Sequence, residues 1–328
     1  MNLFPFLFML ILSIFMGINS KTMFFMWLWL EVNTMSFIPV MIFFNKYFND
    51  NFIKYFIFQC ISSSLMFISF ASEYLISLNM LLYIILMFVI FMKMGMFPFL
   101  FWYMNIIPHL SYINCLILFT AQKILIYYMF SKMMMTFEMS LFQMNLFYLL
   151  IALNSISSVF LIWKKNSIKI ILGASSINHS SWLLLLLNWN IYMWMIYFSL
   201  YTMTLTYLML KLMNMNIFNL KNIYKINNNN KIYIFTLMLL LMMMPPTIMF
   251  FMKMYTIQIY MNSLSLMLTF LLIMSTVMFY YFYLKILFPT IFLSKTVKNY
   301  KNFLHMTYSP QNFFMLLLIL FLFNYIPI

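Results

Sequence analysis

The sequence predicts an all-α polytopic membrane protein of about 11 transmembrane helices, arranged as two inverted five-helix repeats that each contain a broken helix. The chain has 328 residues, of which 66% are hydrophobic and only 7% are charged. A typical soluble protein carries about 25% charged residues, so lipid is expected to surround most of this surface. Apolar runs near the roughly 20 residues that an α-helix needs to cross a bilayer recur along the chain.

The helix boundaries are predicted from these apolar runs and from the polar segments between them. The expected spans are 3–18, 22–44, 53–70, 76–105, 110–130, 142–163, 168–187, 190–212, 231–259, 264–288 and 312–327. The fourth and ninth runs are too long for one straight crossing, and both contain helix-breaking residues. The fourth has Gly95 and Pro98 after Lys93, and the ninth has Pro245-Pro246 before Lys253. Proline removes a backbone donor, so both helices are expected to break within the membrane.

The positions of the two breaks indicate an internal repeat. Each broken helix is the fourth member of a five-helix group, and broken helices at corresponding positions are typical of inverted repeats with an ion site between them. Because five is odd, the second group enters the membrane from the opposite face. The predicted division is 1–130 for the first repeat, 131–290 for the second, and 291–328 for a loop and a C-terminal helix.

The residue bias indicates a mitochondrial origin. Methionine (39) and phenylalanine (41) are abundant, glycine is rare (3), and arginine is absent. This bias is typical of an AT-rich animal mitochondrial genome with an additional codon for methionine. No Arg-rich amphipathic transit peptide precedes the first apolar run, as expected for a chain synthesised inside the organelle. The predicted location is therefore the mitochondrial inner membrane, with several crossings.

Lysine placement predicts the orientation. The loops after helices 2, 6, 8 and 10, counted with the helix ends that flank them, carry thirteen lysines, whereas the remaining loops carry only Lys21 and Lys132. The thirteen are Lys46, Lys54, Lys164, Lys165, Lys169, Lys211, Lys221, Lys225, Lys231, Lys285, Lys295, Lys298 and Lys301. The positive-inside rule then places the N-terminus and the lysine-rich loops, among them the segment holding Lys225 and the one holding Lys298, in the matrix. The C-terminus is expected in the intermembrane space. The net charge of +14 is spread over many loops, which favours membrane lipids, with cardiolipin a candidate, and argues against nucleic acid.

Four ionisable residues lie inside long apolar stretches: Glu31, Lys93, Lys123 and Lys253. Placing such a group near the bilayer centre costs at least about 2.5 kcal/mol, so these residues indicate a proton or cation path. His179 lies among four serines of the seventh span, where it either only forms hydrogen bonds or takes part in a water chain. A static ion pair for Glu31, and snorkelling to the interface for Lys123, are the simpler alternatives.

No cofactor site is expected on this chain. Cys60 and Cys115 lack the spacing of metal or iron–sulfur ligands, and they are expected to be buried, inert thiols. The three glycines stand far apart, so no glycine-rich loop can hold a nucleotide or flavin phosphate. Any redox chemistry that this protein serves should take place on another chain.

Several segments resemble the antiporter-like subunit family of mitochondrial NADH:ubiquinone oxidoreductase (respiratory complex I), and within it the subunit 2 group. The segments lie in the expected order between residues 24 and 285, and the eleven-helix count is similar to that of animal members. They are FFMWLWLEVNTMSFIPV from Phe24, KYFIFQ from Lys54, MKMGMFPFLFW from Met92, Gln122-Lys123, LGASSINHSSW from Leu172, and Pro245-Pro246 followed by Phe251 and Lys253.

The resemblance implies a proton-translocating membrane-arm subunit without its own redox site. Its partners would be other membrane-arm subunits, and NADH, FMN, iron–sulfur clusters and ubiquinone would bind to other subunits. It also implies that Glu31 pairs with Lys93, that Lys123 and His179 continue the path, and that Lys253 belongs to its exit half. A stand-alone cation/proton antiporter and a scaffold subunit without transport are the alternatives. Co-purification with NADH-oxidising subunits and replacement of Lys93 would distinguish the three.

Overall fold

The computed structural model describes residues 3–45, 51–73, 79–136, 140–163, 165, 167–218, 228–242, 247–261 and 266–292. Pro245-Pro246, Lys225, Lys298 and the predicted helix at 312–327 lie outside the described residues. Within those ranges the regular structure is helical, and no β-strand occurs. The helices are α1 (Phe4–Asn19), α2 (Met23–Phe44), α3 (Asn51–Glu73), α4 (Asn79–Met94), α5 (Leu100–Ile106), the 3-10 turn η1 (Ile107–His109), α6 (Tyr112–Phe119), α7 (Ala121–Thr136), α8 (Leu141–Ile162), α9 (Ile168–Trp189), α10 (Ile191–Asn214), α11 (Asn228–Met242), α12 (Ile248–Tyr260) and α13 (Leu266–Phe292).

The described helices follow the predicted spans closely. Each of the first ten predicted spans contains at least one helix. Seven helical stretches in the described part of the chain are long and apolar enough to cross a membrane, and three shorter apolar helices accompany them. The expectation of a polytopic helical membrane protein is therefore confirmed, whereas the total of eleven helices and the inverted repeat stay predictions.

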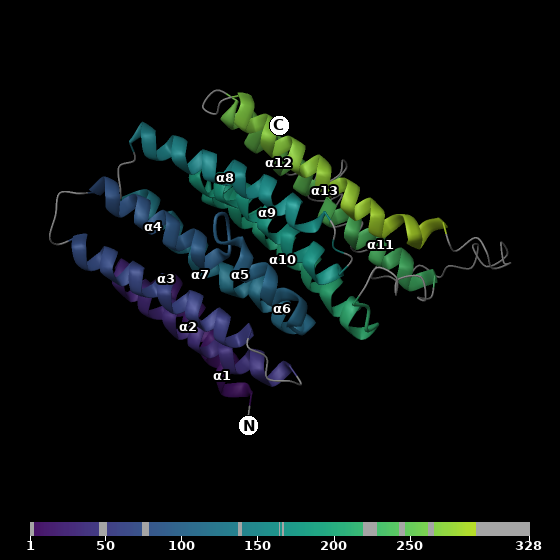
Figure 1. Cartoon of the computed structure of the whole chain (residues 1–328), viewed down its shortest axis with the longest axis horizontal. Coiled ribbons are helices and arrows are strands. Elements are labelled where there is room, and N and C mark those ends of the chain that lie inside the picture. Colours follow the sequence, from purple (N-terminus) through teal and green to yellow (C-terminus); the bar gives the residue numbers. More distant parts are fainter. Residues whose placement is uncertain are drawn as a thin grey trace.

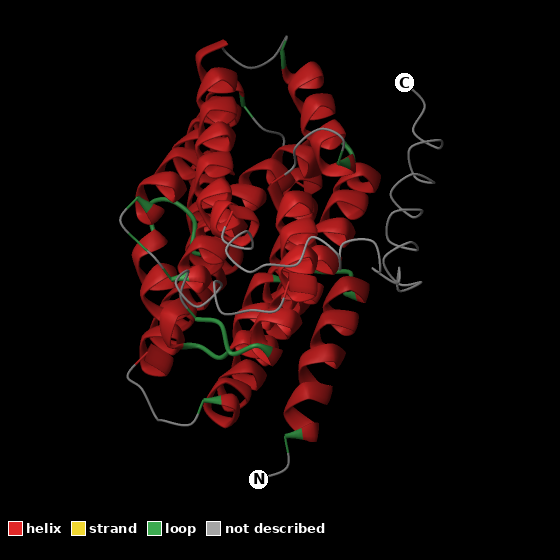
Figure 2. Ribbon diagram, turned by 90° about the vertical axis from the view of Figure 1, so that its right-hand side faces the viewer, coloured by secondary structure: helices red, strands yellow, loops and turns green. Residues whose placement is uncertain are grey.

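The helices pack side by side in an order that largely follows the chain. Figure 1 shows α1–α3 at one side, then α4–α7, then α8–α10, and α11–α13 at the opposite side. Seen after a quarter turn, the bundle has helices running along its height and short loops at its ends (Figure 2). Residues drawn from different helices can therefore form a row that crosses the bundle sideways.

Helix α9 occupies the centre of the bundle. It contacts helices of both flanks, namely α5, α6, α7, α8, α10, α12 and α13. Its side chains from Ile168 to Leu187 are all buried. A helix that is covered on every side can carry polar groups away from lipid, and α9 carries His179 with its four neighbouring serines.

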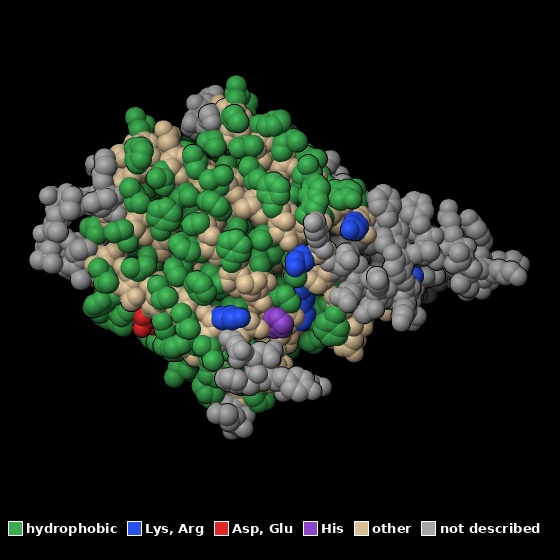
Figure 3. Space-filling view, viewed as in Figure 1, with side chains coloured by type: hydrophobic (Ala, Val, Ile, Leu, Met, Phe, Trp, Pro, Cys, Tyr) green, Lys and Arg blue, Asp and Glu red, His purple; other side chains and the backbone are tan. Residues whose placement is uncertain are grey.

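The outer surface is apolar, as a lipid-facing surface should be. The face in Figure 3 is mostly hydrophobic, and its few visible lysines gather toward the lower right. Large apolar side chains point outward from helices along the whole chain, including Phe15 of α1, Ile68 of α3 and Phe160 of α8. These exposed side chains would be unfavourable in water and favourable against lipid.

The first predicted break is confirmed at Gly95. Helix α4 ends in a Schellman motif, in which Met96 N donates to Phe91 O at 2.9 Å and Gly95 N donates to Met92 O at 3.2 Å. This motif requires a left-handed residue after the helix, and Gly95 has φ +68°. Glycine adopts that conformation without steric cost, so α4 stops at Met94, and five residues (95–99) separate it from α5.

A second interruption, at Thr120, differs from the prediction of one helix over 110–130. Thr120 has φ −118° and ψ −77°, and it separates α6 from α7. Its hydroxyl donates to Leu116 O at 2.8 Å, and its own carbonyl accepts from Lys123 N at 3.0 Å. Threonine hydroxyls that bond back to the preceding turn bend helices, which places this bend three residues before Lys123.

Candidate functional site

Lys93 lies in the last turn of α4, directly before the break. Its side chain is 4% exposed, and its Nζ has no hydrogen-bond partner within the structure. The backbone groups that the break releases are instead occupied by side chains. Gln59 Nε2 donates to Lys93 O at 3.3 Å, and Trp102 Nε1 donates to Met92 O at 3.1 Å. The two backbone carbonyls at the break are thus hydrogen-bonded without the Lys93 amine, and that amine remains available for other interactions.

A small cavity has both Lys93 and Lys123 in its wall. Its volume is about 20 Å³, and its lining residues are Leu30, Thr34, Tyr55, Gln59, Lys93, Met94, Trp102, Tyr103, Leu118, Gln122, Lys123 and Ile126. A water molecule needs a volume of at least about 10–15 Å³ and two to four polar partners. Two amines, two amides and several hydroxyls supply those partners, so the cavity suits a water molecule between α4 and α7.

Glutamine and asparagine side chains link the helices around this cavity. Gln122 Nε2 donates to Asn33 Oδ1 at 2.9 Å, and Tyr55 donates through its hydroxyl to Gln122 Oε1 at 3.4 Å. Asn33 belongs to α2, Tyr55 to α3 and Gln122 to α7. Interhelical hydrogen bonds of this kind contribute about 0.6 kcal/mol each on average within membranes, and here they fix α7 beside the helix of Glu31.

Glu31 is half-buried at mid-length of α2. It lies within electrostatic range of Lys93, but the Lys93 amine bonds to no side chain of the described structure. The direct form of the predicted Glu31–Lys93 pair is therefore not formed, and the water-bridged form stays a prediction. Thr34, whose hydroxyl donates to Glu31 O at 2.9 Å, lines the cavity that Lys93 also lines.

Lys123 is joined to the central helix. Its side chain is 3% exposed, and its Nζ donates to Ser176 O at 3.1 Å and approaches Ser176 Oγ at 3.4 Å. The Tyr103 ring lies 5.6 Å from the same amine. The alternative of snorkelling to the interface is wrong, because the amine of Lys123 points to α9 and is held there.

His179 lies one turn further along α9. Its side chain is 4% exposed, and its Nδ1 lies 3.1 Å from the Tyr197 hydroxyl. The Tyr201 ring packs against the imidazole, with 4.7 Å between the ring centroids. His179 is within electrostatic range of both Lys123 and Lys253. Along α9, His179 lies between Ser176, which accepts from Lys123, and Trp182, whose ring faces Lys253.

Lys253 lies in α12 and points inward. It is 7% exposed, and its Nζ lies 5.1 Å from the centroid of the Trp182 ring of α9. A lysine over a tryptophan face is stabilised by the ring quadrupole. All four basic members of the predicted set are thus buried inside the bundle, on α4, α7, α9 and α12, and none of the four faces lipid.

Two residues of this region escaped the sequence reasoning. Lys169 was counted among the loop lysines, but it lies in the first turn of α9 and is 7% exposed. Its amine donates to Leu110 O and lies beside the stacked ring pair of Tyr112 and Phe218, 5.0 and 5.2 Å from the two ring centroids. Asn154 of α8 donates to Ile177 O at 3.2 Å and accepts from Phe97 N at 3.0 Å. A neutral amide in an apolar run gives no sequence signal of such a role.

The described residues contain no group of three or more His, Cys, Asp or Glu that could hold a metal ion. Cys60 and Cys115 are free thiols. The functional groups in the bundle interior are therefore amines, an imidazole, amides and hydroxyls, which exchange protons and bind water.

Comparison with known proteins agrees with this arrangement. Residues 20–279 match the model of a family described as NADH:quinone oxidoreductase/Mrp antiporter, transmembrane. The chain belongs to this family. It is 31% identical over 242 residues to NADH-ubiquinone oxidoreductase chain 2 of Anopheles gambiae. The matched segment covers 69% of this chain and 67% of that protein. It is 28% identical over 221 residues to the protein of the same name from Lumbricus terrestris, covering 66% and 64%.

Solved structures share this fold. A chain of respiratory complex I from Thermus thermophilus with bound aureothin superposes with a TM-score of 0.76 at 15% identity, covering 88% of this chain and 70% of that one. This member of the antiporter-like family is thus a multi-pass helical membrane protein, and its buried amines occupy the interior of the shared fold.

Proposed function

We propose that this chain is a membrane-arm subunit of respiratory complex I that moves protons through a lateral row of Glu31, Lys93, Lys123, His179 and Lys253. The observation that carries the proposal is a connection within the row, from Lys93 through Lys123 to the helix that carries His179. Lys93 and Lys123 line one polar cavity, and Lys123 reaches through Ser176 to the helix that carries His179.

The chemistry of the row suits proton transfer. Lysine sheds its proton when desolvated, whereas arginine does not, and all the buried cations of the row are lysines or a histidine. A buried ionisable group within a membrane is retained at a cost of at least about 2.5 kcal/mol, which a purely apolar side chain would avoid. Four such groups beside a central polar helix favour transport over a scaffold role.

The remaining features of the proposal concern the surroundings of the chain. NADH oxidation and ubiquinone reduction would occur on other subunits, which carry FMN and iron–sulfur clusters, and this chain would hold no cofactor of its own. Residues 1–130 and 131–290 would form the two inverted five-helix repeats, with α9 in the second. The N-terminus and the lysine-rich loops would face the mitochondrial matrix, with anionic lipids near them.

The proposal is tested with the intact complex carrying Lys93→Met. Methionine keeps apolar bulk but cannot be protonated, so we expect normal assembly on a blue-native gel together with a coupled turnover reduced at least about ten-fold. Lys54→Met is the matched control, because Lys54 is an exposed lysine at the start of α3. Full proton pumping by an assembled Lys93→Met complex would contradict the proposal.

A stand-alone cation/proton antiporter would belong to the same family as a complex I subunit. A separate experiment distinguishes these two functions. If the chain acts alone, a tagged copy should purify without NADH-oxidising subunits and should exchange cations for protons in vesicles. We expect it instead to co-purify with those subunits.

A further inference from the structure

The row has a gap between Lys123 and His179, and two hydroxyl groups stand in it. We propose that Tyr201 of α10, acting with Ser176 of α9, relays protons between Lys123 and His179. This inference rests on the proposed function and adds two residues to the path. Neither residue is charged, so neither attracts notice in a search for buried ionisable groups.

Ser176 is the shared partner of three groups. Its hydroxyl donates to Gly173 O at 2.7 Å, lies 2.8 Å from the Tyr103 hydroxyl, and lies 3.4 Å from Lys123 Nζ. A serine hydroxyl has one proton to give and two lone pairs to accept with. While Lys123 is protonated, Ser176 accepts from Lys123 and Tyr103 and keeps its own proton on Gly173 O. The Ser176 hydroxyl then uses its one donor proton and both of its acceptor lone pairs.

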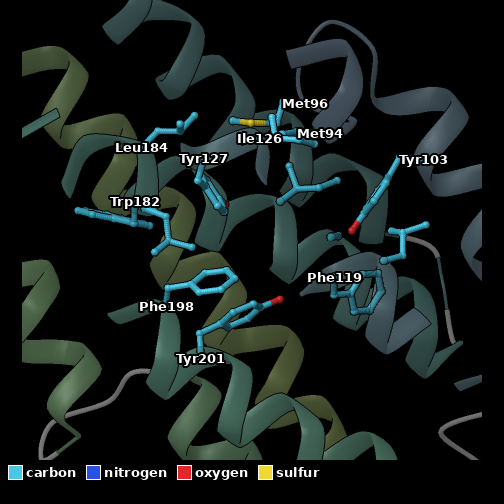
Figure 4. Packing of buried hydrophobic residues seen from close by; sticks show 14 of the residues in the cluster. Met94, Met96, Tyr103, Phe119, Ile126, Tyr127, Trp182, Leu184, Phe198 and Tyr201 are labelled. Atoms are coloured by element: carbon cyan, nitrogen blue, oxygen red, sulfur yellow. The ribbon is translucent and has the colours of Figure 1, made fainter. Parts of the chain in front are cut away.

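Tyr201 approaches the same serine from the other side. Its side chain is 1% exposed, and its hydroxyl lies next to Ser176 without a well-formed hydrogen bond to any residue that the structure describes. Figure 4 shows the hydroxyl groups of Tyr103 and Tyr201 pointing toward each other. Tyr103 is anchored by its bond to Ser176, whereas Tyr201 keeps both its proton and its lone pairs available.

The ring of Tyr201 completes the connection. It packs on the His179 imidazole at 4.7 Å between centroids, and Ser176 and His179 are neighbours on one face of α9 because they are three residues apart. The Tyr197 hydroxyl meanwhile contacts His179 Nδ1, which fixes the orientation of the imidazole. The ring of Tyr201 thus contacts His179, the proton acceptor, while its hydroxyl lies near Ser176, on the side of the proton donor Lys123.

The transfer balances without any further reactant. The Lys123 ammonium gives a proton to Ser176 Oγ, and the serine's own proton turns from Gly173 O to the Tyr201 oxygen. In the proposed relay, the Tyr201 proton then passes to an imidazole nitrogen of His179 through one bridging water molecule. Lys123 ends as a neutral amine and His179 as an imidazolium, while both hydroxyls keep the number of protons with which they began.

Tyr201→Phe tests the inference in the intact complex. Phenylalanine keeps the ring against His179 and removes only a hydroxyl that has no protein partner, so assembly and thermal stability should be unchanged. We expect proton pumping per NADH or coupled turnover to fall by roughly ten-fold or more, as for removal of a proton-transfer group. A packing role for Tyr201 would leave both quantities at the wild-type level.

Tyr127→Phe is the matched control. Tyr127 of α7 is fully buried, and its hydroxyl also lacks a well-formed hydrogen bond among the described residues, but its ring packs on Trp194 and Phe198 rather than on His179. We expect wild-type pumping from this variant. Equal losses in Tyr127→Phe and Tyr201→Phe would overturn the assignment, because the effect would then be a general one of removing buried hydroxyls.

Two further variants separate this inference from the proposed function. Ser176→Thr keeps the hydroxyl and should keep turnover, whereas Ser176→Ala should lose it. If Lys123→Met abolishes pumping while Tyr201→Phe and Ser176→Ala retain it, the relay is wrong and the proposed function stands. If Lys123→Met also pumps fully, the proposed function fails as well. Should Tyr201→Phe fail to assemble, the Ser176 pair decides the relay.

Discussion

The side-chain oxygen of Asn154 accepts a hydrogen bond of 3.0 Å from the backbone nitrogen of Phe97. Phe97 lies in the connection between α4 and α5, just beyond the glycine that ends the lysine helix. The other end of the same amide donates to Ile177 O at 3.2 Å, between Ser176 and His179. One fully buried side chain of α8 therefore fixes the helix break relative to the central helix.

Replacing Asn154 by leucine should destabilise this arrangement. The change leaves Phe97 N without its acceptor, and an unsatisfied buried group costs about 1–3 kcal/mol. We expect a lower midpoint of thermal inactivation for the purified complex and a loss of coupled turnover. Asn154→Asp keeps an acceptor for Phe97 N and should be less damaging than leucine. Identical behaviour of the two variants would show that the bond to Phe97 has little effect.

Two glycine substitutions should differ sharply in severity. In Gly95→Ala the alanine would have to adopt the positive φ of Gly95, and its Cβ would lie 2.6 Å from Tyr103 Cβ. The Tyr103 Cβ is attached directly to the backbone and cannot easily move. Gly173→Ala would meet the far end of Ile107, Cδ1, at 2.4 Å, which a rotamer change can relieve. We expect assembly to fail for Gly95→Ala and to survive for Gly173→Ala, as measured on blue-native gels.

The hydrogen bond between Asn33 and Gln122 should contribute measurably to the packing of α2 against α7. A double-mutant cycle with Asn33→Leu and Gln122→Leu is expected to give a coupling energy of about 0.5–2 kcal/mol. Thermal unfolding of the four complexes provides the measurement. A coupling energy near zero would mean that the amide pair adds nothing beyond the separate contacts of its members.

The orientation can be measured on exposed lysines within the described structure. Lys21 lies between α1 and α2, whereas Lys54 opens α3 and Lys165 precedes α9. A membrane-impermeant amine reagent added to mitoplasts should therefore modify Lys21 and spare Lys54 and Lys165. Inside-out vesicles should give the reverse pattern. Modification of Lys54 from the intermembrane-space side would contradict the matrix assignment of the lysine-rich loops.

The sequence predicted the fold well where strong local signals exist. Apolar runs of membrane-spanning length marked the helices, and the Gly95–Pro98 segment marked the break in the fourth span. The interruption at Thr120 went unpredicted, because threonine is common within transmembrane helices and bends them only in some contexts. Lys169 was misplaced for a related reason, since a lysine at the end of an apolar run normally lies at the membrane surface.

The site was predictable only in its charged members. Burying an amine in lipid is costly enough that Lys93, Lys123 and Lys253 stand out from the sequence alone. Gln59, Asn154 and Tyr201 do not, because neutral polar side chains cost less to bury and asparagine and tyrosine are abundant throughout this chain. Their roles depend on which helices lie opposite them, and that information comes only from packing.

The complete burial of α9 has a consequence for biosynthesis. This helix leaves the ribosome before α10, α12 and α13, which later cover it. During that interval His179 would lack its partner Tyr197 of α10, and unpaired polar groups are unfavourable in lipid. The growing chain must therefore shelter α9 against earlier helices or against the insertion machinery until the last helices arrive. A chain that stops after α10 would leave Asn178 without its contact to Ser275 of α13 and Trp182 without the amine of Lys253 of α12.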